Sequence, residues 1–185
     1  MSSTRGFSLL ETTIAIGIFI LMALAMYDLW ISNDFLVRSQ IATIDVVGSA
    51  SALMTDVQNY VLQADAVATS HTFSGTSYTS TTTTLVLELP SVDGSGNIIV
   101  GQHDYAVFYA SGTTAFRRVD TGTGSARSTT THQLSETITA LTFSYNASPI
   151  TQSTNVSVDV QTQESVKKKT TSTHVTGTIY LRNKQ

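Results

Sequence analysis

The first part of the chain carries a long apolar segment. Residues 7–26 are almost all apolar, and residues 12–27 contain no charged side chain. About 20 such residues in a helix are long enough to span the hydrocarbon core of a bilayer. The pattern therefore predicts, over residues 7–28, a helix that crosses a membrane or packs among other apolar helices.

Beyond this segment, apolar residues recur mostly every three or four positions. This spacing places them on one stripe of a helix, with polar residues such as Arg38 and Asp45 between them. No proline occurs before Pro90. We therefore predict an amphipathic continuation of the helix over residues 29–68, whose stripe packs on a C-terminal domain. The predicted stripe consists of Phe35, Ile41, Ile44, Val47, Met54, Val57, Val61, Ala64 and Val67.

The C-terminal part of the chain changes to short runs in which apolar and polar residues alternate. Residues 69–84 are rich in Ser and Thr without a helical period, which predicts a connector. Residues 85–185 contain about six or seven strand-like runs with short links between them, which favours antiparallel pairing. Because a sheet must cover its apolar face, the helix stripe is its available partner. The predicted fold class is α+β: a long N-terminal helix, its first half transmembrane, packed on a mainly antiparallel β-sheet.

Composition narrows the function classes. The chain has 185 residues, about the length of one domain, and it has no cysteine, which excludes a disulfide framework and a thiolate metal site. Its formal net charge is −3, and charged residues make up 12% of the chain. This charge is too small and of the wrong sign for a basic nucleic-acid face. Nucleic acid is therefore not expected as a partner.

Glu11 is the unusual residue of the apolar segment, because an ionised carboxylate inside a bilayer costs about 3 kcal/mol. Three interpretations of the segment are open. The first is a cleaved secretory signal, with Arg5 as its positive end and Ala-Leu-Ala at 23–25 as the cleavage site. The second is an uncleaved membrane anchor. The third is a segment that follows a leader peptide, with the cut between Gly6 and Phe7.

Only the third interpretation gives Glu11 a partner. Cleavage after Gly6 creates a free amine on Phe7, four residues before Glu11 and on the same face of a helix. The amine and the carboxylate then neutralise each other, within one helix or between packed helices. A buried charge is tolerated when it is paired in this way.

The stretch Gly6-Phe7-Ser8-Leu9-Leu10-Glu11 resembles the class III leader junction of type IV pilins and type II secretion pseudopilins. The resemblance implies a leader peptide over residues 1–6, a prepilin peptidase that cleaves after Gly6, and N-methylation of Phe7. It also implies that Glu11 contacts the Phe7 amine of a neighbouring subunit during assembly. The chain lacks the proline that many of these helices carry along the apolar segment, and Asp28 stands nearby instead.

The order of helix, connector and sheet also resembles the pilin architecture over the whole chain. Several strand-like runs resemble minor pilins and J-type minor pseudopilins, which implies a place at the filament tip or in its priming complex. The implied partners are other pilin or pseudopilin subunits, the prepilin peptidase, an inner-membrane assembly platform and, before assembly, membrane lipid. The runs are those at residues 85–89, 105–109, 116–118, 141–145 and 180–183.

The same resemblance implies a location. The chain would cross the bacterial inner membrane once, with its C-terminal domain on the periplasmic or extracellular side, and then enter a pilus or pseudopilus. An alternative of another class is an adhesive or binding β-domain, exported by an ordinary signal peptide or held by an anchor. The mature N-terminus separates these interpretations: Phe7 for a pilin, Met26 for a cleaved signal, and Met1 or Ser2 for an anchor.

The sequence offers little chemistry, and we expect neither an enzyme nor a resident cofactor. It contains no nucleophile elbow and no phosphate-binding loop. Because some pseudopilins bind calcium, calcium is a candidate ligand: Asp93, Ser95 and Asn97 imitate the start of a calcium loop, with Asp104 at its twelfth position. However, Ile98 replaces the glycine that such a loop needs at its sixth position, which favours a plain hairpin turn.

Two groups of basic residues remain. Arg117 and Arg118 point to opposite faces if they lie in a strand, so that one of them pairs with an acid such as Asp120 or both lie along a solvated edge. The lysines at 167–169 form the only dense run of charge. This run predicts a solvated loop tip.

Overall fold

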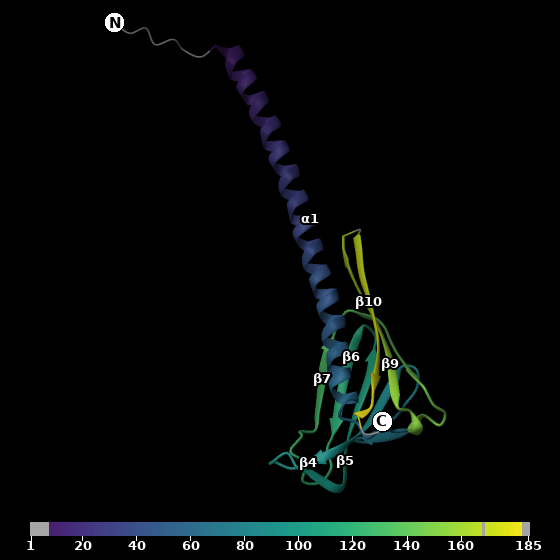
Figure 1. Cartoon of the computed structure of the whole chain (residues 1–185). Helices are drawn as coiled ribbons and strands as arrows, with labels where there is room; N and C mark the ends of the chain where they lie inside the picture. The colour runs from purple at the N-terminus through teal and green to yellow at the C-terminus, as the bar shows by residue number, and fades with distance from the viewer. Residues whose placement is uncertain (1–7, 168, 183–185) are drawn as a thin grey trace. The chain divides into compact units, whose positions relative to one another are not determined.

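The computed structural model describes residues 8–167 and 169–182 and is drawn in Figure 1. The chain forms two compact units, Met1–Ile41 and Ala42–Gln185. The long helix α1, Leu9–Val61, begins in the first unit and ends in the second. Its 53 residues correspond to about 80 Å of helix. The structure confirms the α+β fold class, with an apolar N-terminal helix packed on C-terminal antiparallel sheets.

The second unit consists of the end of α1 and a set of strands. A short 3-10 helix, η1, separates β8 from β9. In the described residues the strands are β1 Ala66–Val67, β2 Ser70–Phe73, β3 Thr76–Thr79, β4 Thr84–Val92, β5 Ile98–Ser111, β6 Thr114–Asp120, β7 Thr130–Ser135, β8 Ile138–Tyr145, β9 Asn155–Val166 and β10 Lys169–Tyr180, with η1 at Ile150–Gln152.

These strands form two sheets and one separate hairpin. One sheet has five strands in the order β1-β4-β5-β6-β7, the other has three in the order β10-β9-β8, and β2 pairs only with β3. All pairings between the described strands are antiparallel, as the short links predict. One core, shared by the end of α1 and both sheets, holds the unit together.

The helix packs on the sheets with a different stripe from the predicted one. Val57 and Val61 are fully buried, as expected, but Ile44 and Val47 are 70% and 43% exposed. The spacing predicts mostly large apolar residues on the buried face, whereas Ala42 and Ala50 also lie on it. The buried stripe consists of Ala42, Val46, Ala50, Leu53, Val57 and Val61.

The small side chains of Ala42 and Ala50 let the helix backbone approach the sheet closely. The buried hydroxyl of Thr162 on β9 donates a hydrogen bond of 2.9 Å to the backbone carbonyl of Val46. A large residue at Ala42 or Ala50 would hold the two elements apart. Ile41, Ile44 and Val47, which the pattern favoured, therefore lie on the open side of the helix.

The helix ends at Val61, seven residues before the predicted end near residue 68. Its last turn tightens, with the amide of Ala64 bonded to the carbonyl of Val61. The chain then runs into β1, where Val67 pairs with Leu87 of β4. Ala64 and Val67 are fully buried, although they lie beyond the end of the helix. Their apolar side chains, spaced three residues apart, extended the helical pattern of the sequence past Val61.

The predicted connector at residues 69–84 is a structured part of the fold. It contains the β2–β3 hairpin, which packs on the face of the five-stranded sheet opposite α1. Phe73 of this hairpin is fully buried beside Val86 and Val107, and the His71 ring stacks on Tyr105 with 3.8 Å between centroids. The sheet is therefore covered on both faces at this point.

Candidate functional site

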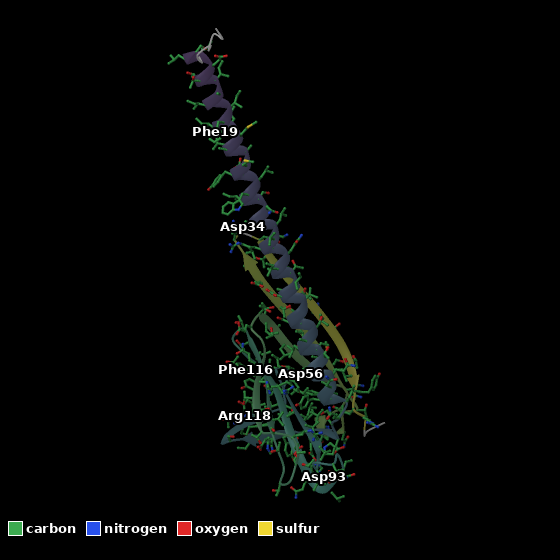
Figure 2. The ribbon with its side chains drawn as sticks, turned by 90° about the vertical axis from the view of Figure 1, so that its left-hand side faces the viewer. Phe19, Asp34, Asp56, Asp93, Phe116 and Arg118 are labelled. Atoms are coloured by element: carbon green, nitrogen blue, oxygen red, sulfur yellow. The ribbon has the colours of Figure 1, made fainter. Side chains whose placement is uncertain are left out.

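The candidate functional site is the surface of α1 in the first unit. From Leu9 to Ile31 every described side chain of this helix is exposed, and the apolar ones point outwards on all sides. Figure 2 shows Phe19, which is 72% exposed, projecting from the helix in this way. A helix that is apolar all round is stable only in lipid or among other helices. The rest of the described chain does not cover this surface.

The helix is also suited to a membrane. Among the described residues, α1 is the one helix that is long and apolar enough to cross a bilayer, and none of its most apolar stretch is buried within the protein. Gly17 does not interrupt it, and a side chain added there would meet open space. On the C-terminal side of the apolar stretch, Asp34 and Arg38 form an exposed ion pair of 2.9 Å one turn apart.

Glu11 has a local role that the sequence analysis did not identify. Its carboxylate accepts a hydrogen bond of 3.0 Å from the backbone amide of Ser8, and its own amide donates one of 3.2 Å to the Ser8 hydroxyl. These reciprocal bonds form a capping box, which satisfies amide groups at the start of a helix. The spacing Ser-x-x-Glu carries this signal in the sequence, so the capping box could have been recognised there.

The cap changes the interpretation of the carboxylate. Glu11 lies in the first turn of α1, where the helix dipole favours negative charge. Part of the reason for an acid in this apolar segment is therefore local. The predicted cleavage site at Gly6 and Phe7, with the N-methylation of Phe7, lies outside the described residues.

The four calcium candidates do not form one site. Asp93 lies in the β4–β5 turn, and its carboxylate accepts hydrogen bonds from the amides of Ser95 and Asn97 at 2.8 and 2.9 Å. The Asn97 amide, followed by that of Ser95, lowers the pKa of Asp93 below its ordinary value. The turn thus uses its own donors to satisfy the acid. Asp104 lies on β5, six residues beyond Ile98 where that strand begins, and belongs to a separate network.

Asp104 is fully buried and is held by four donors. Burial raises its pKa, but the hydrogen bonds outweigh burial, and the pKa of Asp104 lies below its ordinary value. The donors fill both carboxylate oxygens and leave no arrangement for a calcium ion, so these residues do not fit a calcium site. The donors are the hydroxyls of Ser91 and Ser125 at 2.7 and 2.8 Å, the amide of Gly122 at 2.8 Å and the guanidinium of Arg127 at 2.7 Å.

This network fastens a loop to the sheet. Arg127 also donates to the Pro90 carbonyl at 2.6 Å and to the Gln63 side chain at 3.1 Å, so it joins the β6–β7 loop to β4 and to the end of the helix. Gly122 lies so close that an added Cβ would be 2.8 Å from the His103 carbonyl. Asp104 and its donors therefore form a structural clamp.

The two neighbouring arginines are oriented as the strand alternation predicts. Arg117 points to the helix and pairs with Asp56, and its guanidinium lies 4.7 Å from the centre of the Tyr60 ring. Arg118 points to the other face, 6.0 Å from the Phe73 ring. The proposed partner Asp120 instead bonds His71, with 2.9 Å between nitrogen and oxygen.

Several of the remaining charged residues in the described part of the chain form separate pairs. Three histidines each contact a carboxylate in a different part of the fold, and no cluster of three potential ligands occurs among the described residues. The expected loop tip at 167–169 is the β9–β10 turn, where Lys167 and Lys169 are exposed. The histidine pairs are His71 with Asp120, His103 with Glu88, and His174 with Asp159.

The described architecture is pilin-like: a long apolar N-terminal helix whose C-terminal part packs on antiparallel sheets. No protein-family model, no curated protein and no solved structure matches the chain. The function is therefore argued from the architecture and from the exposed helix.

Proposed function

We propose that this chain is a pilin-like structural subunit, of the minor type, that assembles into a type IV pilus or a type II secretion pseudopilus. One observation carries the proposal: the chain combines a complete globular core with a helix that is apolar on every side and contributes no buried side chain from Leu9 to Ile31. The globular unit does not need that helix surface for its own core, so the surface serves an external partner.

The proposal gives the exposed helix two successive environments. Before assembly, lipid surrounds it and holds the subunit in the inner membrane as a single-pass protein. During assembly, helices of other pilin or pseudopilin subunits replace the lipid. Both environments are apolar, so the transfer requires little change in hydrophobic free energy and depends on packing and on paired polar groups.

Glu11 supplies such a polar group. A prepilin peptidase that cleaves after Gly6 would leave a positive amine on Phe7, next to the helix N-terminus. The helix dipole disfavours positive charge at that end. The Glu11 carboxylate lies in the first turn, where it would offset the new charge in its own subunit or in a neighbour. Pairing with a neighbour would favour docking at one axial position.

The alternative is an adhesive or binding β-domain that uses the same helix as a signal or an anchor. It shares the exposed apolar surface but gives Phe7 no special role. The chemical identity of the mature N-terminus therefore distinguishes the two functions.

The test is mass spectrometry of the N-terminal peptide after expression in a bacterium that has a prepilin peptidase. We expect N-methylated Phe7 and a loss of Met1 to Gly6. Gly6→Ile should leave the precursor uncut, whereas Gly17→Ile, which alters a glycine within the helix, should be processed normally. A mature N-terminus at Met26 would indicate a cleaved signal peptide, and one at Met1 or Ser2 an anchor; either result would contradict the proposal.

A further inference from the structure

One strand of the three-stranded sheet has an unpaired edge. β10 pairs with β9 along its whole length, from Lys169 with Val166 to Tyr180 with Asn155, and no other described strand pairs with it. In an antiparallel strand, alternate residues direct their amide and carbonyl groups towards the open edge. Charge and proline are the usual protections of such an edge, and residues 175–180 contain neither.

A groove runs along this open edge. One wall is β10 at residues 176–180, and the other is formed by Met54 and Gln58 of α1 and by Leu62, which directly follows the last residue of α1. Arg182 also lines the groove, just beyond the end of β10. The groove has a volume of about 540 Å³.

The position of the helix keeps the groove open. The buried residues Leu53, Val57 and Val61 fix one side of α1 on the core, and the Asp56–Arg117 pair fixes an adjacent side to β6. The line that begins at Met54 is therefore held beside β10, with Met54 itself partly buried against the core. Leu62 remains 40% exposed at this wall.

The two walls have complementary chemistry. The helix wall is apolar at Met54 and Leu62, and the strand wall carries the unpaired backbone groups of β10. The two walls approach each other at Gly177, where an added Cβ would be 3.5 Å from the end of Met54. A row of backbone donors and acceptors facing an apolar helix is the arrangement that binds an extended peptide by strand addition.

The groove continues past the end at which Arg182 lies. Leu62 and Arg182 also line a second hollow of about 350 Å³, where Ile98 is 64% exposed. Arg182 thus lies where the two hollows meet, and its guanidinium suits a carboxylate. A segment that follows β10 from Thr176 to Tyr180, about 17 Å of strand, would reach it.

We propose that this groove binds an extended segment of another polypeptide, added to β10 as a fourth strand. The segment carries apolar side chains at alternate positions, which face Met54 and Leu62, and a carboxylate near Arg182. The row of β10 backbone groups selects an extended chain over a helix, because a helix satisfies its own backbone groups internally. The inference is independent of the proposed function, since it rests on the globular unit alone.

The test uses the full-length protein in detergent micelles and the peptide acetyl-Thr-Val-Thr-Val-Thr-Val-Asp-amide. We expect saturable binding in a calorimeter, and slower hydrogen exchange of amides within residues 175–180 when the peptide is bound. A version of the peptide that is N-methylated at every amide has no backbone donors and should not bind. Absence of saturable binding by the first peptide up to millimolar concentration would overturn the proposal.

Variants locate the binding. Leu62→Glu should weaken the peptide at least tenfold, whereas Ile44→Glu, the same change about 27 Å away along α1, should not. A second peptide has Asn in place of the final Asp and is otherwise identical. Arg182→Glu should weaken binding of the Asp peptide more than binding of this Asn peptide. Circular dichroism confirms that each variant is folded.

Two results from these variants would overturn the proposal. Unchanged binding by folded Leu62→Glu would exclude the groove. A wild-type dimer that Leu62→Glu converts to a monomer would assign the groove to a second copy of the chain.

Discussion

The carboxylate of Asp56 on α1 accepts a hydrogen bond from the guanidinium of Arg117 on β6, across 61 positions of sequence. Their side chains are 23% and 14% exposed, and Arg117 also lies over the ring of Tyr60. One oxygen of Asp56 and the Nε of Arg117 are buried without a hydrogen-bond partner. The pair joins helix to sheet and fixes how far α1 is rotated about its axis.

Asp56→Ala should lower the free energy of unfolding by about 1–3 kcal/mol, because it leaves the arginine largely desolvated and without its partner. Arg117→Ala in the same background should then cost less than it does in the wild type, since the two changes remove one interaction. Chemical denaturation of the full-length protein in detergent micelles measures all four members of this cycle. Arg118→Ala, on the opposite face, should show no coupling to Asp56. Simple additivity of Asp56→Ala and Arg117→Ala would contradict the prediction.

The clamp around Asp104 should make stability depend on pH. The pKa of Asp104 is lower in the folded protein than its ordinary value of 3.8. Ionised Asp104 therefore stabilises the fold above the unfolded pKa, and this contribution is lost as the pH falls towards the folded pKa. Asp104→Asn should reduce the free energy of unfolding by about 2–3 kcal/mol at neutral pH.

The difference between wild type and Asp104→Asn should be constant above about pH 5 and shrink below about pH 4. Urea denaturation at a series of pH values measures it. Asp45→Asn, on the exposed side of α1, is the control and should change the stability by less than about 0.5 kcal/mol. A difference for Asp104→Asn that grows towards acid pH would show that the sign is wrong.

The capping box and the proposed assembly contact of Glu11 can be separated by two substitutions. Glu11→Gln keeps a side chain that can accept the Ser8 amide but removes the charge, whereas Glu11→Ala removes both. If charge pairing drives assembly, both variants should lose crosslinking to partner subunits to the same degree. Ser8→Ala, which removes only the cap hydroxyl, should retain it.

All three Glu11 and Ser8 variants should still enter the membrane, since the apolar stretch is unchanged. Fractionation and crosslinking in one strain measure both properties. Wild-type crosslinking by Glu11→Gln would show that the carboxylate acts through the helix cap and not through a charge on a neighbouring subunit.

The sequence was sufficient for those parts of the fold that depend on regular alternation. Leu85, Leu87 and Leu89 are fully buried on one face of β4, and Val156, Val158 and Val160 are buried on one face of β9, as their spacing predicted. The long helix was equally clear, because its apolar content leaves no other stable state. These features follow from the periods of strand and helix alone.

The errors arose where tertiary contact decided the outcome. Ala42 and Ala50 face the sheet because a short side chain permits close approach, which no scale of hydrophobicity rewards. The β2–β3 hairpin was missed because Phe73 and Tyr78 are its only large apolar residues, and they pack on aromatic rings from distant strands. The groove beside β10 could not be predicted from the sequence either, since the order of the strands in the sheet decides which strand lies at its edge.

The Ser- and Thr-rich segment at residues 69–84 has the composition at which protein engineers place tags and insertions. Here it shields Val86 and Val107, two fully buried valines on the second face of the sheet. Its removal would expose an apolar patch on β4 and β5, a surface that promotes aggregation. For fusion or labelling, the β9–β10 turn at Lys167 is the better choice, because β8 ends before it and the side chains of Lys167 and Lys169 are exposed.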